Sequence, residues 1–491
     1  MTNYKKQDLN AKRIGPTITP DRSRVLLRPF YPVNVNIAKR IISNIDALSD
    51  SEVSVLLLQV MEEFENRHEH FEKLLLKRFL EVHQLSKDAN IPSIERQLLI
   101  GSYFLHEYSH ESAALFNPSI VAHPDQTMLP DGFLRFILSL RSTGEGHISS
   151  ISFRVGTIDT LHNIILEPSV PFVTEPDSVP NAIYHKELFI RKLQEIGLYN
   201  DFCRNILHNL SDTFILDELR NEILSMDNMK SVITNNSIFN AASGILLLAE
   251  SNYEVCFSSK SQLSQRVLFP SVPSQKNGIE DARFVRFQKE DGSFTYYATY
   301  TAYDGKITLP QLLETEDFIH FKFITLNGAA VQNKGMALFP RQINGQYAML
   351  SRQDDENIFL MFSDNIHFWQ TQKFLIKPTQ PWEFIKIGTC GSPIETKAGW
   401  LVLSHGVGAM RKYCLGAFLL DLNDPSRIIG SLYKPLLSPN KDEREGYVPN
   451  VVYTCGALLH RDNLIIPYAM SDYATSFASI LIDELLDFMT S

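Results

Sequence analysis

The chain has 491 residues, of which 44% are hydrophobic and 21% are charged, and it carries a formal net charge of −10 at pH 7. This composition is typical of a globular protein, and the negative charge argues against nucleic acid as a partner, because contact with a phosphate backbone requires a basic face. The N-terminus has no apolar signal segment and no apolar run approaches about 18 residues, so we expect a cytoplasmic protein with no membrane contact.

The first part of the chain is predicted to be helical. Residues 1–32 form an N-terminal segment that leads into the main domain, and residues 33–115 form an α-helical module. In runs such as SEVSVLLLQVMEEF, which begins at Ser51, apolar residues recur three and four positions apart, as they do on one face of a helix. The same spacing predicts a helical insertion at about residues 186–235.

The remaining sequence between residues 116 and 485 is predicted to be a β-domain. Short apolar runs such as ISSISFRVG, GILLLAES, TYYATYTAYDG and WLVLSHGV are separated by Gly, Pro, Asn and Asp. A weak repeat, LLAESNYEVCF, LLETEDFIHF and MFSDNIHF, includes one spacing that fits a propeller blade of about 40–50 residues. We therefore predict an all-β five-bladed β-propeller with appended and inserted helical segments. A pair of β-sandwich domains is the alternative, although it would call for a linker between them.

A propeller gathers polar residues from distant parts of the chain around its central channel, so scattered motifs can form one site. The stretch NGIEDARF places Glu280, Asp281 and Arg283 after a glycine turn. A carboxylic acid at a strand start can act as a general acid when its surroundings raise its pKa, and a neighbouring Arg can orient it. Taken alone, the motif is more typical of a solvated ion pair.

Three further stretches carry candidate residues. QNKGMALFPRQINGQYAMLSR contains Lys334 and Arg352, GTCGSPIETKAGWLVLSHGV contains His405, and PYAMSD ends on Asp472. Each has an ordinary explanation by itself, since cations often solvate strand ends and a lone histidine on an apolar strand is usually a core residue.

In chain order, the blocks GIEDAR, NKG-x3-FP-x3-NG-x-Y-x-ML-x-R, W-x5-GTCGSPIET-x2-GWL-x3-HGV, Y-x-LGA-x-LLDL-x-DP, EG-x-VPNVVY-x-CG and PYAMSD resemble glycoside hydrolase family 130, the mannoside phosphorylases and related β-mannosidases. The resemblance extends from about Asn117 to Asp472. It implies a five-bladed β-propeller that cleaves β-mannosides with inversion and, in the phosphorylases, releases α-mannose 1-phosphate.

The resemblance also implies a role for individual residues. It assigns the general acid to Asp281, whose proton is thought to pass through a sugar hydroxyl. The residues implied to bind phosphate are Lys334, Arg352, His405 and Tyr413. The residues implied to bind the substrate are Glu280, Arg283, Asp472, Asn117 and Arg154. Departures from the family pattern are Ala282 in place of a proline, Gly335 in place of an aspartate, and Ser351 and Ser404 in place of His and Tyr. The missing proline should loosen the turn that presents Asp281.

The implied site favours phosphorolysis over hydrolysis. Phosphate is an anionic nucleophile that needs cations and hydroxyls, whereas an inverting hydrolase needs a second carboxylate to activate water. We therefore predict a β-mannoside phosphorylase. The alternatives are a β-mannosidase on the same fold, with Glu395 or Glu445 as its base, and a non-catalytic carbohydrate-binding propeller.

The predicted partners are a mannose-containing oligosaccharide and inorganic phosphate as co-substrate, with no other cofactor. The five cysteines are widely spaced without a CxxC motif, so we expect reduced thiols and no metal site. The helical segments could form a homo-oligomer interface or a wall of the acceptor site, or simply pack on their own propeller.

Overall fold

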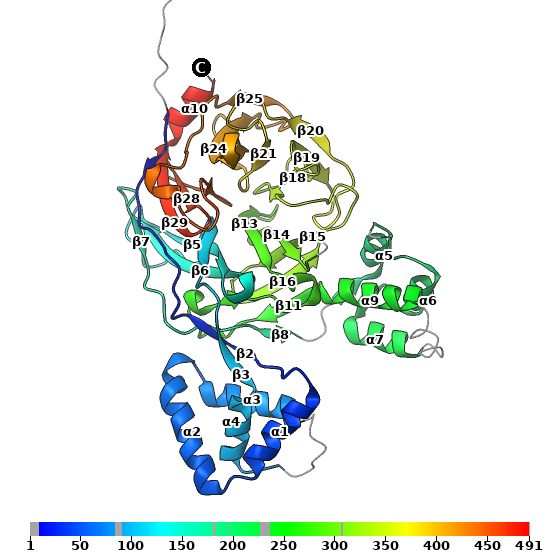
Figure 1. The fold of residues 1–491 in the computed structure, drawn as a ribbon. Coiled ribbons are helices and arrows are strands. Elements are labelled where there is room, and N and C mark those ends of the chain that lie inside the picture. Colours follow the sequence, from blue (N-terminus) through cyan, green and yellow to red (C-terminus); the bar gives the residue numbers. More distant parts are fainter. Residues whose placement is uncertain are drawn as a thin grey trace, which may run out of the picture.

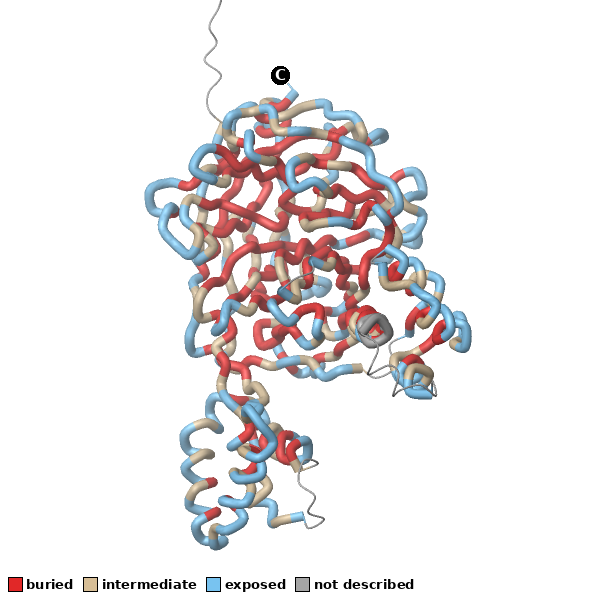
Figure 2. Tube along the Cα trace, turned by 45° about the vertical axis from the view of Figure 1, so that its right-hand side comes forward, coloured by how far each residue is buried: buried red, intermediate tan, exposed pale blue. Residues whose placement is uncertain are grey.

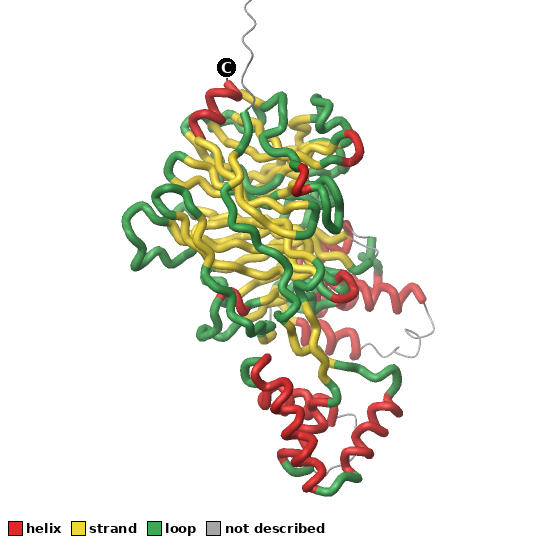
Figure 3. Tube along the Cα trace, turned by 60° about the vertical axis from the view of Figure 1, so that its left-hand side comes forward, coloured by secondary structure: helices red, strands yellow, loops and turns green. Residues whose placement is uncertain are grey.

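The computed structural model describes residues 9–490 apart from 84–90, 180–182, 196, 226–235 and 306–307. The described residues form five antiparallel sheets of four to six strands, two sheets of two strands, and helices at the periphery (Figures 1 and 3). Residues 1–8 of the predicted N-terminal segment and 226–235 of the predicted helical insertion lie outside the described residues.

The five larger sheets are numbered in the order in which their main strands follow one another along the chain. The first sheet contains β4 (Ala114–Ala122), β5 (Leu134–Thr143), β6 (Ser149–Ile158), β7 (Ile164–Leu166) and β12 (Val267–Leu268). The second contains β8 (Asp177–Val179), β11 (Tyr253–Cys256), β13 (Ile279–Gln288), β14 (Phe294–Tyr303), β15 (Thr308–Thr315) and β16 (His320–Thr325). The third contains β17 (Ala337–Leu338), β18 (Tyr347–Ser351), β19 (Ile358–Ser363) and β20 (Lys373–Ile376).

Two more sheets complete the body. The fourth sheet contains β21 (Lys386–Thr389), β22 (Ile394–Thr396), β23 (Gly399–Val407), β24 (Tyr413–Leu420) and β25 (Ile428–Ser431). The fifth contains β1 (Lys12–Arg13), β26 (Val452–Tyr453), β27 (Leu458–His460), β28 (Asn463–Met470) and β29 (Ala474–Leu481).

The five sheets close into a ring. Contacts join β4 to β13, β14 to β17, β18 to β21, β24 to β26, and β28 back to β4. A separate hydrophobic cluster fills each of these five junctions. Because both faces of a sheet are covered, strands such as β23 read as nearly continuous apolar runs and are buried throughout. Figure 2 shows the buried residues concentrated in this body and the exposed ones along the helices.

The two ends of the chain meet in the fifth sheet. The short strand β1 pairs with β29, with Lys12 opposite Ser479 and Arg13 opposite Ala478. A further bridge joins Ile18 to Thr475. The N-terminal segment therefore supplies an outer strand to the last sheet and closes the ring by backbone hydrogen bonds.

A helical unit is attached to this ring by a two-stranded ladder. It consists of α1 (Val35–Asp46), α2 (Asp50–Phe64), α3 (Phe71–His83) and α4 (Ile94–Ser102), and it is joined by β2 (Val25–Pro29) and β3 (Leu105–Ser109) (Figure 1). Ser49 and Glu52 form a capping box that starts α2. Within the described residues, no helix is long and apolar enough to cross a membrane.

The second helical unit is longer than predicted. It contains β9 (Ile183–His185), α5 (Lys186–Glu195), α6 (Asp201–Asn209), β10 (Thr213–Ile215), α7 (Leu216–Ser225) and α9 (Asn236–Glu250). The prediction of a strand at GILLLAES, residues 244–251, is wrong, because this run forms the second half of α9. Its residues Ile245, Leu248 and Ala249 are spaced as on one helical face and pack against Leu219. A last helix, α10 (Ile482–Thr490), follows β29.

Candidate active site

Asp281 lies in a β-bulge of the second sheet. Strand β13 places two residues, Asp281 and Ala282, opposite a single residue of β14, because the register shifts between Glu280 and Arg283. The backbone of Asp281 is left-handed, with φ +55°, a conformation that residues with side chains adopt rarely. Ala282, which replaces the proline of the family pattern, is buried in the core between the first and second sheets.

A similar irregularity in the first sheet faces this bulge. The register of β4 shifts between Phe116 and Ser119, and Asn117 within the shift has φ +48°. The Nδ2 atom of Asn117 donates a hydrogen bond of 2.5 Å to Oδ1 of Asp281. The two bulges thus turn an amide and a carboxylate toward each other from neighbouring sheets.

Arg141 contacts both Glu280 and Asp281, and no sequence motif singled it out. Its Nη2 donates to Glu280 Oε1 at 2.8 Å, and its Nη1 lies 3.4 Å from Oδ1 of Asp281. Its Nε donates to Ser149 Oγ at 2.8 Å, and its guanidinium lies over the ring of Phe116. The signal that could have found it is an arginine within the apolar run FILSLRST, because a charge inside a strand needs a partner.

Positive charge dominates the surroundings of Asp281. Burial raises the pKa of this carboxyl, but the charges of Arg141, Lys334 and Arg283 and the hydrogen bond from Asn117 outweigh it, so the pKa is lowered to about 2. The carboxyl group is therefore ionised at neutral pH when no ligand is bound.

Three of the four predicted phosphate-binding residues form one cluster. Arg352, which follows β18, has Nη1 3.2 Å from Nε2 of His405 on β23. The rings of His405 and Tyr413 are stacked, with centroids 6.0 Å apart. The fourth residue, Lys334, lies on the carboxylate side, with Nζ 3.6 Å from Oε2 of Glu280.

The hydrogen-bond pattern fixes the tautomer of His405. A guanidinium can only donate, so Nε2 of His405 accepts from Arg352 and the proton of the neutral ring lies on Nδ1. Burial and the neighbouring positive charges, of which Arg352 is the strongest, hold the pKa of His405 well below its usual range, which keeps the ring neutral. The Nδ1 atom is buried and has no hydrogen-bond partner among the described residues. It is a free donor for a ligand.

Arg283 and Tyr453 connect the two halves of the site. Nη1 of Arg283 donates to the backbone oxygen of Asp281 at 3.1 Å, and its Nη2 donates to the hydroxyl of Tyr453 at 2.7 Å. The ring of Tyr453 packs edge-on against His405, with centroids 4.9 Å apart. Tyr453 comes from the matched block VPNVVY, but nothing in its sequence context singled it out.

Gly388 makes room for Arg352 and His405, which together with Tyr413 form the cation cluster. It pairs with His405 across β21 and β23. A Cβ atom at this position would lie 2.4 Å from Cε1 of His405 and 3.1 Å from Nη1 of Arg352. The absence of a side chain at Gly388 therefore leaves room for the side chains of His405 and Arg352.

Unpaired buried polar atoms mark this place as a ligand site. Among the described residues, those buried without a hydrogen-bond partner include Asn117 Oδ1, Arg283 Nε, Arg352 Nε and His405 Nδ1. An orphaned buried polar group is unfavourable, so a cluster of them indicates a missing polar partner.

Two other predicted residues have different outcomes. Asp472 follows β28 with φ +50°, and burial together with the charge of Asp281 raises its pKa to about 6.

Arg154, which was predicted to bind the substrate, does not lie with the other predicted residues. Its partner on β5 is Leu138, so its side chain lies on the opposite face of the sheet from Arg141, where Nη2 donates to Glu111 at 2.8 Å. It belongs to a buried ion pair and not to the site.

The two carboxylates considered as hydrolytic bases lie at the surface. Glu395 forms two hydrogen bonds of 2.8 Å with Arg341. Glu445 is exposed in the segment that precedes β26. Neither residue shares the burial of Asp281.

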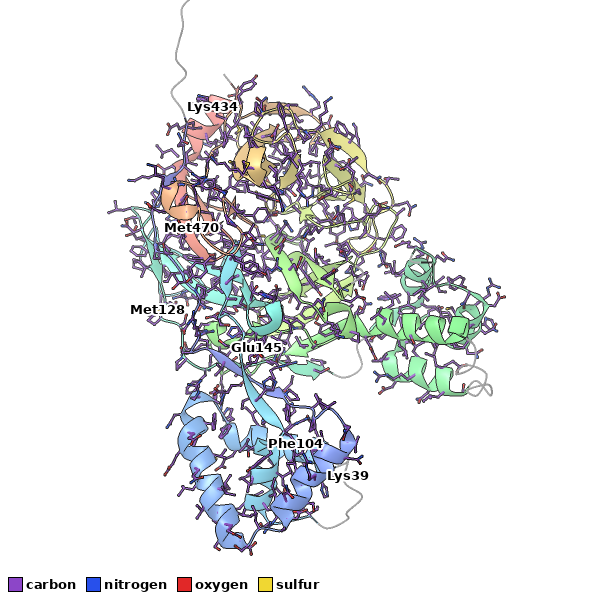
Figure 4. The ribbon with its side chains drawn as sticks, viewed as in Figure 1. Lys39, Phe104, Met128, Glu145, Lys434 and Met470 are labelled. Atoms are coloured by element: carbon purple, nitrogen blue, oxygen red, sulfur yellow. The ribbon has the colours of Figure 1, made fainter. Side chains whose placement is uncertain are left out.

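His147 and Tyr447 form an aromatic pair near Ser149, the residue to which Arg141 donates. His147 is in the turn between β5 and β6, two residues from Ser149, and Figure 4 labels Glu145 in the same turn. Its Nδ1 lies 3.2 Å from the hydroxyl of Tyr447, and the two rings are 5.6 Å apart. Tyr447 is 54% exposed, so its ring is accessible.

Comparison with known proteins agrees with this picture. Residues 240–491 match the family model of glycoside hydrolase family 130, described as beta-1,4-mannooligosaccharide phosphorylase. A 1,2-beta-oligomannan phosphorylase of Thermoanaerobacter sp. (strain X514) is 34% identical over 46% of this chain and 75% of its own length. A Beta-1,4-mannooligosaccharide phosphorylase of Ruminococcus albus is 34% identical over 32% of this chain and 51% of its own length.

Among solved structures, a Beta-1,2-Mannobiose phosphorylase from Listeria innocua in complex with beta-1,2-mannobiose aligns at 24% identity and a TM-score of 0.46. The alignment covers 78% of this chain and 93% of that one. The family model extends over more than half of the chain and includes the bulge of Asp281, the cation cluster and Asp472. The chain is therefore an enzyme of the glycoside phosphorylase type and belongs to glycoside hydrolase family 130, as its sequence motifs predict.

Proposed function

We propose that the protein catalyses inverting phosphorolysis of β-mannosides and releases α-mannose 1-phosphate. Asp281 is the general acid, and inorganic phosphate is the nucleophile. Lys334, Arg352, His405 and Tyr413 bind the phosphate. The names of the relatives support a β-mannoside as substrate, and they include both 1,2- and 1,4-linked compounds.

The free donors of the cation cluster carry this proposal. Nδ1 of His405 and Nε of Arg352 are buried without partners, and both can only donate. Phosphate oxygens would accept from both donors, and the bond from the Arg352 guanidinium, whose Nη2 also lies 3.1 Å from Asp355, would be charge-assisted. The cluster is therefore better suited to an anion than to a hydrolytic water.

Phosphate binding also explains how Asp281 obtains its proton. The pKa of Asp281 is about 2, too low for an acid at neutral pH. A negative charge close to a carboxyl group raises its pKa. A phosphate dianion beside Asp281 would therefore raise this pKa and make the carboxyl group better able to donate. The acid becomes competent only when the nucleophile is present.

In the proposed reaction a phosphate oxygen attacks the anomeric carbon of the mannosyl unit from the face opposite the leaving group. The glycosidic bond breaks, and the leaving oxygen receives the proton of Asp281, relayed through a hydroxyl of the sugar. Asn117, Arg141 and Glu280 hold that sugar and the acid in place. The exposed pair of His147 and Tyr447 would contact the leaving sugar beside them.

A β-mannosidase on the same fold is the second candidate, and the raised pKa of Asp472 favours considering it. A carboxyl group with a pKa of about 6 is largely ionised at neutral pH and could serve as a general base for water. Under that mechanism, turnover would not depend on phosphate.

The test is to incubate the protein with β-1,2- and β-1,4-mannobiose, with and without inorganic phosphate. We expect mannose 1-phosphate to form only when phosphate is present. Release of mannose at an equal rate in both conditions would reject phosphorolysis in favour of hydrolysis. Turnover of neither compound in either condition would favour a carbohydrate-binding protein.

Substitution of the acid provides the control. Asp281→Asn should lower kcat by about 10²–10⁴-fold, because proton donation is lost while the shape of the site is kept. The matched variant Asp364→Asn changes an exposed carboxylate that accepts from Gln346, and it should retain full activity. Full activity in Asp281→Asn would exclude this residue as the acid.

Two structural proposals accompany this function. The ring of five sheets, each packed on the next, is the arrangement expected of a five-bladed β-propeller, with one sheet per blade. The helical units remain candidates for a subunit interface, and a gel-filtration mass equal to one chain would exclude that role.

A further inference from the structure

A pair of histidines joins the first and fifth sheets far from Asp281. His162 lies in the turn between β6 and β7, and His460 ends β27. β6 starts at Ser149, which contacts Arg141, and β28 ends two residues before Asp472. The histidines lie at the other ends of these strands, and strands of eight to ten residues span about 25–33 Å.

Each ring faces the other with its Nδ1 atom. Nδ1 of His162 and Nδ1 of His460 are 3.3 Å apart, and the rings are inclined by 76°. The other nitrogen of each ring has an acceptor beside it. Nε2 of His162 lies 3.2 Å from Oδ1 of Asp462, and Nε2 of His460 lies 2.9 Å from the backbone oxygen of Gly132.

The tautomers of the two rings decide what their Nδ1 atoms can bind. The backbone oxygen of Gly132 accepts only, so Nε2 of His460 carries the proton of that ring, and a proton on Nε2 of His162 faces the carboxylate of Asp462. Both Nδ1 atoms then present lone pairs to each other. Any other distribution of two protons leaves a lone pair against an oxygen instead. A cation between the Nδ1 atoms satisfies all three contacts.

We propose that His162 and His460 bind a divalent transition-metal ion of the zinc, nickel or copper class through their Nδ1 atoms. Two imidazoles on one tetrahedral zinc ion, with Zn–N distances of about 2.0–2.1 Å, have their nitrogens about 3.3–3.4 Å apart, which is the separation observed. The contacts at Nε2 are those by which carboxylates and carbonyls orient metal-binding histidines.

The surroundings suit a bound cation. The nearby charges are those of Asp159, Asp462 and Arg461, which sum to one negative charge. His162 is partly exposed, so an ion and the waters that complete its coordination have access. The bound ion would fasten the first sheet to the fifth on the side away from the reaction.

The experiment is equilibrium dialysis of the tag-free full chain against Zn²⁺ at pH 7.5, with thermal unfolding as a second measurement. We expect one Zn²⁺ per chain and a rise in Tm of about 1–3 °C that EDTA reverses. His162→Gln and His460→Gln should each abolish both effects. Asp462→Asn keeps both ligands and should weaken binding about 10-fold or more.

His320→Gln is the matched control, because His320 also pairs with an aspartate, Asp317, but faces no second histidine. It should bind Zn²⁺ as the wild type does. The proposal fails if the wild type binds none of Zn²⁺, Ni²⁺ and Cu²⁺, or if the two ligand variants bind them equally well. If the ligand variants do not fold, Cu²⁺ bound to the wild type should show an electron paramagnetic resonance spectrum of two imidazole nitrogens, and its absence overturns the proposal.

Discussion

At the scale of single residues, the site combines the carboxylates of Glu280 and Asp281 with several positive side chains. Arg141, Lys334 and Arg283 all lower the pKa of Asp281. Under the proposed mechanism, an acid in such surroundings cannot work until an anion offsets these charges. The charges proposed to hold phosphate would therefore also control the proton.

This dependence predicts a pH profile. If Asp281 is the acid, it donates only when protonated, and bound phosphate raises its pKa. We therefore expect kcat at saturating phosphate to fall as the pH rises, approaching about tenfold per pH unit above the pKa of Asp281 in the complex, measured as initial rates between about pH 5 and 9. Asp472 titrates in the same range, so the residual activity of Asp472→Asn should keep the fall. A kcat that is constant across this range would contradict the proposed coupling.

A second prediction concerns the glycine beneath the cation cluster. Gly388→Ala places a methyl group 2.4 Å from Cε1 of His405 and 3.1 Å from Arg352, so both must shift. A displacement that costs about 1.4 kcal/mol of phosphate binding raises KM for phosphate about tenfold. Steady-state kinetics with each substrate varied in turn should show this rise, with KM for the mannoside nearly unchanged. An equal rise in both constants would point to general disruption of the site.

At the scale of elements, two bulges and one short strand matter most. The bulges in β4 and β13 turn Asn117 and Asp281 out of their ladders. A motif such as GIEDAR marks the residues but not the register shift, because a bulge depends on the partner strand. Helix α9 shows the same limit, since an apolar run of eight residues fits a buried strand or a buried helix equally well.

The short strand β1 offers a stability test. Nε of Arg13 donates to Glu443 at 2.6 Å, and Glu443, which is buried, also accepts from the hydroxyl of Tyr468. Arg13→Ala leaves this carboxylate short of a partner. Because Arg13 is about one-third exposed, solvent screens part of the loss, and we expect the free energy of unfolding to fall by about 1–3 kcal/mol.

Urea-induced unfolding measures this change. Lys12→Ala, in the exposed neighbouring position of the same strand, is the control and should change stability by less than about 0.5 kcal/mol. Equal effects of the two substitutions would show that the strand's contribution does not depend on the pair with Glu443.

At the scale of the whole molecule, the ring explains how distant segments make one site. Asn117 belongs to the first sheet, Asp281 to the second, Arg352 to the third and His405 to the fourth, while Asp472 follows a strand of the fifth. Asn117 and Asp281 lie near the starts of β4 and β13, which are each the first strand in the order of their sheet. Arg352, His405 and Asp472 lie at or just beyond the ends of β18, β23 and β28, which are each the second. The helical units attach to the outside of this ring and supply none of these residues.

The sequence by itself determined the family, the strand-rich body, and most residues of the site, because ordered motifs with Asp281, Arg352 and His405 depend on residue identity alone. Only the tertiary structure decided that Arg141 contacts Asp281 while Arg154 is buried against Glu111. Both are arginines in apolar strands, and strand parity, bulges and the packing of neighbouring sheets determine which one faces the site. The pairing of His162 with His460 has the same origin, because nearly 300 residues separate them and closure of the ring brings them together.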